Sequence, residues 1–180
     1  MADRAKRVVL ITGGARSGKS RYALSLADGA ETRAFIATAT EVDDEMRLRI
    51  ETHRRDRGDR FYTVEEPYDL AGAIGALRPG TEIAVVDCLT VWIGNLMYRY
   101  GDDADVQRAI TSFMRALESP PCGIVIVSNE VGMGIVPENA MARRFRDLAG
   151  NANQEIARIA EQVVFMVSGI PLVTKEGRNR

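Results

Sequence analysis

The stretch "VVLITGGARSGKS", residues 8–20, joins a short apolar run to a glycine-rich segment that ends in lysine and serine. Gly13, four further residues, Gly18, Lys19 and Ser20 match the pattern of a phosphate-binding loop, which needs a strand before it and a helix after it. The run "VVLIT" predicts that strand, and "SRYALSLADG" predicts the helix. The local context therefore supports the motif.

Each part of this loop has a chemical purpose. Glycines let backbone N–H groups approach phosphate oxygens at the start of a helix. Lys19 is expected to reach the β- and γ-phosphates, and the Ser20 hydroxyl is expected to bind Mg²⁺. Lys19 is also the only lysine between Lys6 and Lys175 in a chain rich in arginine, which favours a specific role. The predicted nucleotide-binding loop comprises Gly13, Gly14, Ala15, Arg16, Ser17, Gly18, Lys19 and Ser20.

Length and composition bound the remaining possibilities. A chain of 180 residues with 46% hydrophobic content suits one domain, residues 1–180. Lys plus Arg number 24 against 25 for Asp plus Glu, so no overall basic field exists to hold nucleic acid. Cys88 and Cys122 lack the spacing of metal ligands and are expected to be buried thiols. No apolar window suits a membrane span or a signal peptide, so we expect a cytoplasmic protein.

Short apolar runs alternate with helical patterns along the chain, which predicts an α/β fold. Most of the runs are nearly continuous in apolar character, as in parallel strands buried on both faces. The predicted strands are residues 8–12, 34–38, 61–65, 82–87, 123–128 and 163–168. The predicted helices begin at Ser20, Asp43, Asp105 and Asn151. Ligands of such sheets bind beyond the carboxyl ends of the strands, where loops should begin at Gly13, Thr38, Asp87 and Asn129.

Asp87 ends the apolar run "EIAVVD". A second group that binds Mg²⁺ is expected at the end of an apolar strand neighbouring that of the phosphate loop. We therefore predict that Asp87 and Ser20 together hold Mg²⁺. The alternative is that Asp87 caps the helix that follows it, because aspartate is also a favoured N-cap.

His53 is the only histidine of the chain. Met46, Ile50 and His53 share one face of the helix predicted from Asp43, and Arg54, Arg55 and Arg57 follow directly. One interpretation is an ordinary hydrogen-bonded histidine beside a solvated charge run. The other is a nucleophile at phosphorus, whose imidazole the arginines would keep unprotonated while they bind phosphates. The residues alone leave both interpretations open.

Four blocks of the sequence resemble one enzyme family. They are "ITGGARSGKSRYA", "FIATATEVDDEMRLRIETHRRDR", "VVDCLTVWIGNLM" and "VSNEVGMGIVPENAMARRFRDLAGNANQ", and together they span residues 11–154. The chain is similar to the bifunctional adenosylcobinamide kinase/adenosylcobinamide-phosphate guanylyltransferases of cobalamin biosynthesis. The last block is the most specific, because a long match is less easily met by chance than a phosphate loop.

The resemblance implies two reactions. ATP or GTP would phosphorylate the aminopropanol hydroxyl of adenosylcobinamide. GMP from GTP would then pass through a guanylylated histidine to the new phosphate, giving adenosyl-GDP-cobinamide and pyrophosphate. His53 matches that histidine, and Lys19 would be the second catalytic residue. The resemblance further implies a RecA-like P-loop NTPase domain with a mostly parallel sheet flanked by helices, assembled as a homotrimer.

The resemblance also implies which residues contact the nucleotide. Besides the phosphate loop they are Thr38, Ala39, Thr40, Arg54, Arg55, Asp56, Arg57, Glu65 and Asp87. Asp87 stands where relatives can carry glutamate, and either carboxylate can bind Mg²⁺. Asn151 stands where we expect an arginine in relatives. The loop "NEVGMGIVPEN", residues 129–139, could contact the corrinoid or a neighbouring subunit, or could simply be a connection rich in turn residues.

Two other classes of protein would use the same loop. A small-metabolite P-loop kinase would need Lys19, Ser20 and Asp87 but would give His53 no covalent role. A regulatory module driven by GTP or ATP would respond to a protein partner, yet "SNEVG" lacks the lysine and aspartate of a guanine-reading "NKxD" motif. The residues do not decide between ATP and GTP for the kinase step.

Overall fold

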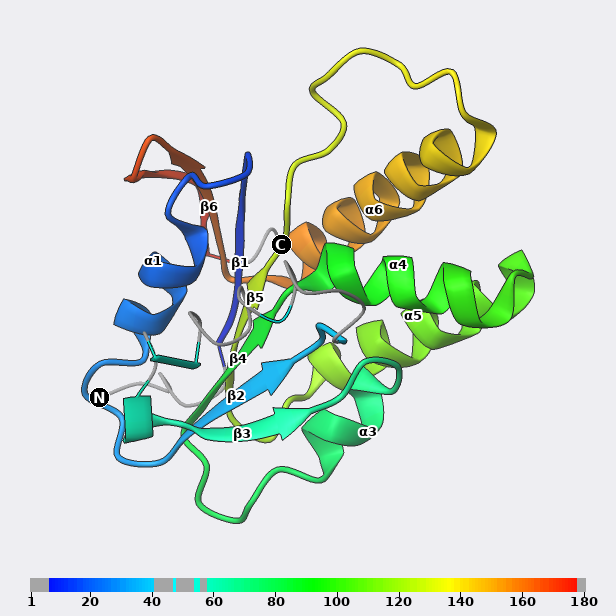
Figure 1. Cartoon of the computed structure of the whole chain (residues 1–180). Helices are drawn as coiled ribbons and strands as arrows, with labels where there is room; N and C mark the ends of the chain where they lie inside the picture. The colour runs from blue at the N-terminus through cyan, green and yellow to red at the C-terminus, as the bar shows by residue number, and fades with distance from the viewer. Residues whose placement is uncertain (1–6, 41–46, 48–53, 56–57, 178–180) are drawn as a thin grey trace.

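A seven-stranded sheet forms the centre of the computed structural model, which describes residues 7–40, 47, 54–55 and 58–177 (Figure 1). The strand order is β3-β2-β4-β5-β1-β6-β7. All neighbouring pairs are parallel except β6 and β7, which are antiparallel. The strands are β1 Val8–Gly13, β2 Arg33–Ala37, β3 Tyr62–Glu65, β4 Ile83–Asp87, β5 Gly123–Val127, β6 Gln162–Val167 and β7 Ile170–Glu176.

Side chains cap the start of three helices, α3, α5 and α6. Asn139 accepts a hydrogen bond from the Ala142 N–H at the start of α6, and Asp102 accepts one from the Ala104 N–H at the start of α5. Such caps satisfy N–H groups that have no partner within the helix. The helices are α1 Lys19–Leu26, α3 Leu70–Gly75, α4 Leu89–Tyr100, α5 Asp103–Glu118 and α6 Ala140–Ile159, with a short 3₁₀ helix η2 at Gly58–Arg60.

Helices cover both faces of the sheet, so alternate residues of the central strands enter different cores. Val9 and Ile11 of β1 pack on the α1 side, whereas Leu10 packs on the side of α3, α4, α5 and α6. Figure 1 shows α1 on one side of the sheet and α4, α5 and α6 on the other. Burial on both faces explains why the central strands are almost continuously apolar. Of the described helices, none is long and apolar enough to cross a membrane.

The six strands predicted from sequence are confirmed, each within one residue at either end. Because β2, β4, β5 and β1 are parallel and adjacent, their carboxyl ends meet at one edge, as predicted. One prediction about this edge is wrong. The strand of Asp87, β4, does not neighbour β1, because β5 lies between them, with Val127 paired to both Asp87 and Ile11. Two strand spacings, about 10 Å, therefore separate β1 from β4.

Several elements differ from the sequence prediction. Helix α6 begins at Ala140 rather than Asn151, because the capping side chain of Asn139 starts it earlier. Helices α3 and α4 and strand β7 were not predicted. Strand β7 lies at the sheet edge, and almost all of its residues are exposed. The helix predicted from Asp43 falls largely outside the described residues.

Lys175 of strand β7 forms hydrogen bonds with the carboxyl end of α6. The Lys175 ammonium donates hydrogen bonds to the carbonyl oxygens of Ala157, Arg158 and Ala160, at 2.7, 3.1 and 2.7 Å. These carbonyls lie at the carboxyl end of the helix, where no later N–H can reach them. The Lys175 ammonium therefore caps the carboxyl end of α6 and holds β7 against it.

Candidate nucleotide-binding site

The glycine loop connects β1 to α1 at the carboxyl edge of the sheet. Its backbone takes left-handed conformations at Gly13 (φ 143°), Arg16 (φ 57°) and Gly18 (φ 94°). A Cβ on Gly13 would lie 2.5 Å from the Met166 carbonyl oxygen, so only glycine fits there. The chain therefore folds back tightly and begins α1 directly at Lys19. This is the strand, loop and helix arrangement predicted from sequence.

Lys19 lies inside the loop, with 6% of its surface exposed. Its ammonium donates to the Gly14 carbonyl oxygen at 2.6 Å and to Ser17 Oγ at 3.5 Å. A buried cation beside the positive end of a helix makes this loop a favourable place for phosphate oxygens. Gly14, Ala15 and Arg16 are exposed above it.

Thr38 joins the ends of β2 and β4. Its hydroxyl donates to the Cys88 carbonyl oxygen at 2.9 Å and accepts from the Cys88 N–H at 2.8 Å, while its own N–H donates to the Asp87 carbonyl oxygen at 3.3 Å. Asn95 on α4 donates to the Thr38 carbonyl oxygen at 2.7 Å. Because Thr38 is fully buried, we infer that its side chain serves the site by fixing the turn after Asp87.

Cys88 is buried at the same turn. Burial, and then the negative charge of Asp87, raise the pKa of the Cys88 thiol to about 11, although the charge of Lys19 acts in the opposite direction. Burial also raises the pKa of Cys122 to about 11. Both thiols therefore stay protonated near neutral pH and are poor nucleophiles. They are buried free cysteines, as the sequence predicted.

Ser20 and Asp87 offer oxygen ligands that suit Mg²⁺. Residues two apart in a strand share one face of the sheet, so Asp87 lies on the same face as Val85, which packs on the α1 side. Both Ser20 and Asp87 are partly exposed. The described residues hold no group of three or more His, Cys, Asp or Glu side chains that could bind a metal by themselves. Mg²⁺ usually takes one or two protein oxygens and completes its shell with water and phosphate oxygens, so this donor set fits.

A second group of predicted contacts lies at the end of β3. Arg54 forms an ion pair with Glu65, and both side chains are exposed. Arg55 is exposed beside it, and Ala39 and Thr40 are partly buried in the segment that follows β2. His53, Asp56 and Arg57 lie outside the described residues, so the assignment of the nucleophile stays a prediction.

The segment 129–139 is a loop, as predicted, and it starts against the phosphate loop. The Glu130 N–H donates to the Gly13 carbonyl oxygen at 3.0 Å. Arg143 on α6 holds the other end through the carbonyl oxygens of Pro137 and Glu138, at 2.9 and 2.6 Å. Between these ends Met133 and Ile135 are 77% and 96% exposed. Their exposure could not be inferred from the glycine and proline content of the loop.

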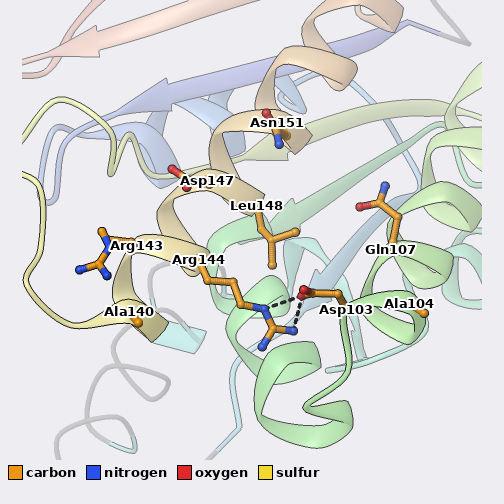
Figure 2. Close-up of a pocket in the computed structure, with 9 residues that line it drawn as sticks. All are labelled: Asp103, Ala104, Gln107, Ala140, Arg143, Arg144, Asp147, Leu148 and Asn151. Atoms are coloured by element: carbon orange, nitrogen blue, oxygen red, sulfur yellow. Dashed lines mark hydrogen bonds and ion pairs between the residues drawn. The ribbon is translucent and has the colours of Figure 1, made fainter.

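A groove of about 640 Å³ lies where α5 begins beside α6 (Figure 2). Figure 2 shows Arg144 directed toward Asp103, with which it forms an ion pair, and Asn151 further along α6. Asp147 and Arg143 also line the groove, so charges of both signs meet there. Asn151, where relatives are expected to carry arginine, thus lies in this groove and not at the phosphate loop.

The glycine loop between β1 and α1, the strand order and the buried Lys19 together form an α/β P-loop fold with a mostly parallel sheet flanked by helices, as the sequence predicted. A KaiC-like protein from Pyrococcus horikoshii superimposes with a TM-score of 0.50 and 13% identity, covering 96% of this chain and 80% of its own. Another Pyrococcus horikoshii protein gives a TM-score of 0.57 with 7% identity, covering 97% of this chain and 88% of its own. At such low identity these similarities bear on the fold alone.

The chain belongs to the cobinamide kinase/cobinamide phosphate guanyltransferase family, whose model matches residues 9–174. The bifunctional adenosylcobalamin biosynthesis protein CobU of Escherichia coli is 41% identical over 180 residues, 93% of this chain and 99% of its own. The corresponding protein CobP of Pseudomonas aeruginosa is 40% identical over 167 residues, 92% of this chain and 96% of its own. The resemblance noted in the sequence is confirmed, and it favours a bifunctional enzyme over a plain kinase or a regulatory module.

Proposed function

We propose that one catalytic domain, residues 1–180, performs both reactions of the family in the cytoplasm, with adenosylcobinamide and then its phosphate as substrates. The observation that carries this proposal is the phosphate loop with its buried Lys19, in a chain whose family match spans residues 9–174. The substrate hydroxyl and the histidine would both have to reach a triphosphate bound at this loop.

In the kinase step the aminopropanol hydroxyl oxygen attacks the γ-phosphorus of ATP or GTP. The bond from that phosphorus to the β-phosphate oxygen breaks, the nucleoside diphosphate leaves and the hydroxyl proton is released. Lys19 and the backbone N–H groups of the phosphate loop stabilise the charge on the phosphates. Mg²⁺, held by Ser20 and Asp87 when bound, would neutralise the triphosphate.

In the transfer step a ring nitrogen of His53 attacks the α-phosphorus of GTP. The bond to the β-phosphate oxygen breaks and pyrophosphate leaves, so that GMP is bound to histidine. A phosphate oxygen of adenosylcobinamide phosphate then attacks the same phosphorus, the P–N bond breaks and His53 is restored. Arg54 and Arg55 follow His53 in the sequence and would bind the departing phosphates, and the Arg54–Glu65 ion pair supports a fixed position for the first of them.

Assembly as a homotrimer is part of the same proposal. Met133, Ile135 and Met141 expose 77%, 96% and 69% of their surfaces around the start of α6. Exposed apolar side chains that gather in one region are typical of an interface. Native mass spectrometry or analytical ultracentrifugation should give three times the mass of one chain, whereas a monomer at micromolar concentration would contradict this part of the proposal.

The covalent step is tested by the intact mass of the protein after incubation with GTP and Mg²⁺ without corrinoid. The wild type should gain one GMP, and the adduct should be acid-labile and alkali-stable as expected of a phosphoramidate. His53→Ala should gain none, yet should still phosphorylate adenosylcobinamide at least in part. Equal loss of both activities in His53→Ala, or an adduct that persists in it, would remove the role given to this histidine.

A further inference from the structure

The turn between β6 and β7, Ser168 and Gly169, contacts the phosphate loop directly. The Gly169 N–H donates to the Ser17 carbonyl oxygen at 3.0 Å. A Cβ on Gly18 would lie 3.3 Å from the Gly169 Cα, so two glycines lie against each other. More than 140 residues separate these segments in the sequence, and the contact exists because β6 pairs with β1.

The backbone of this turn is shaped for the contact. Ser168 has φ 51° and Gly169 has φ 85°, both in the left-handed region. Strand β6 supports the turn, because Met166 pairs with Gly13 at the base of the phosphate loop. The loop is thus held between its own helix on one side and the β6–β7 turn on the other.

The hydrogen bond acts on a peptide unit that matters for phosphate binding. The Ser17 carbonyl and the Gly18 N–H belong to the same planar trans peptide, in which C=O and N–H point in opposite directions. A carbonyl fixed on Gly169 therefore directs the Gly18 N–H away from the turn and toward the inside of the loop. Backbone N–H groups inside such a loop are the donors that hold phosphate oxygens.

We propose that Gly169 is a positioning residue for the nucleotide triphosphate, because its N–H fixes the Ser17–Gly18 peptide of the phosphate loop. This inference rests on the proposed function, in which that loop binds the nucleotide. The effect should fall on nucleotide affinity in both reactions and should leave the KM for the corrinoid substrate unchanged.

The chain supplies a matched control for the test. Gly177, at the other end of β7, also has φ 85°, also has open space where a Cβ would be added, and also donates its N–H to a carbonyl, that of Glu161 at 2.7 Å. Gly169→Ala and Gly177→Ala therefore meet similar backbone strain, since alanine resists a positive φ. Only the first change disturbs the contact with the phosphate loop.

The experiment compares these variants of the full chain by the Kd for a non-hydrolysable GTP analogue with Mg²⁺ and by the KM for nucleotide in each reaction. Gly169→Ala should raise the Kd and the nucleotide KM about tenfold, while both constants of Gly177→Ala should stay within about twofold of the wild-type values. Gly169→Asn should restore most of the affinity, because asparagine tolerates a left-handed backbone and keeps the N–H. Equal nucleotide affinity in the two alanine variants would overturn the inference.

Two further variants keep the result decisive. If Gly169→Ala does not fold, Ser168→Gly loosens the same turn without a steric conflict and should raise the nucleotide KM about threefold, whereas an unchanged KM would refute the positioning role. Lys19→Ala separates this inference from the proposed site. If Lys19→Ala binds nucleotide as tightly as the wild type, the phosphate loop is not the site. If Lys19→Ala loses nucleotide affinity but Gly169→Ala and Gly177→Ala bind nucleotide equally well, only the role of Gly169 is rejected.

Discussion

Replacement of Thr38 by valine should destabilise the protein while leaving its shape almost unchanged. Valine fills the same volume but removes the hydroxyl, which is fully buried and bonded twice to Cys88. The Cys88 N–H then loses its partner, and a buried donor without a partner costs about 1–3 kcal/mol of stability. The Cys88 carbonyl oxygen keeps a second hydrogen bond, from the Trp92 N–H at 3.1 Å. Losing the bond from Thr38 to this oxygen therefore costs only about 1 kcal/mol.

The expected decrease in the free energy of unfolding is therefore about 2–4 kcal/mol for Thr38→Val. For a chain of this length that corresponds to a fall in Tm of about 5–15 °C. Thr38→Ser is the matched control, because it keeps the hydroxyl and removes one buried methyl, at about 1 kcal/mol.

Urea unfolding followed by the fluorescence of Trp92 measures both variants. Trp92 is the only tryptophan, is fully buried and donates from Nε1 to the Tyr68 carbonyl oxygen at 2.7 Å, so its emission should report the loss of the core. A Thr38→Val protein within about 0.5 kcal/mol of the wild type would refute the reasoning. So would a serine variant as unstable as the valine variant.

Three further results are expected. Lys19→Ala should lose both activities while keeping its fold by circular dichroism, because both reactions need the triphosphate held; near-normal turnover would contradict the assignment. Phe113→Ala should lose about 3–5 kcal/mol in urea unfolding, because this fully buried ring packs 5.3 Å from Trp92, centroid to centroid. Stability should decline from pH about 9 to about 11, since unfolded thiols ionise near 9.0 whereas folded Cys88 and Cys122 stay protonated until about 11. The slope should be at most about 1.4 kcal/mol per pH unit for each thiol, and the variant in which alanine replaces both cysteines should lack this part of the decline.

The strands and the phosphate loop could be predicted because their signals are local. The run "VVLI", residues 8–11, is apolar at every position because both sheet faces are covered. The glycine pattern that follows it reflects backbone conformations that other residues resist. Helix α4 gave no such signal. Its sequence "LTVWIGNLMYRY" is mostly apolar and rich in β-branched and aromatic residues, so it lacks the alternation of polar and apolar faces that marks a surface helix.

The remaining features depend on residues that are distant in sequence. Strand β5 lies between β1 and β4 and so separates Asp87 from the strand of the phosphate loop, and no local pattern encodes that order. Thr38 was predicted as a nucleotide contact by family resemblance, yet its burial against Cys88 follows from the pairing of β2 with β4. The contact of Gly169 with Ser17 likewise arises only once β6 lies beside β1.

The positions of the lysine ammonium groups determine which cross-linking reagents can measure the number of subunits. Only three lysines occur, and of the two that the structure describes, Lys19 donates within the phosphate loop and Lys175 donates to the end of α6. Amine-directed cross-linkers would therefore find few reactive groups on the described surface, and a weak cross-linking pattern would say little about subunit number. Reagents that couple carboxylates are better suited to this chain, because Glu138 in the segment 129–139 and Asp147 on α6 are both exposed.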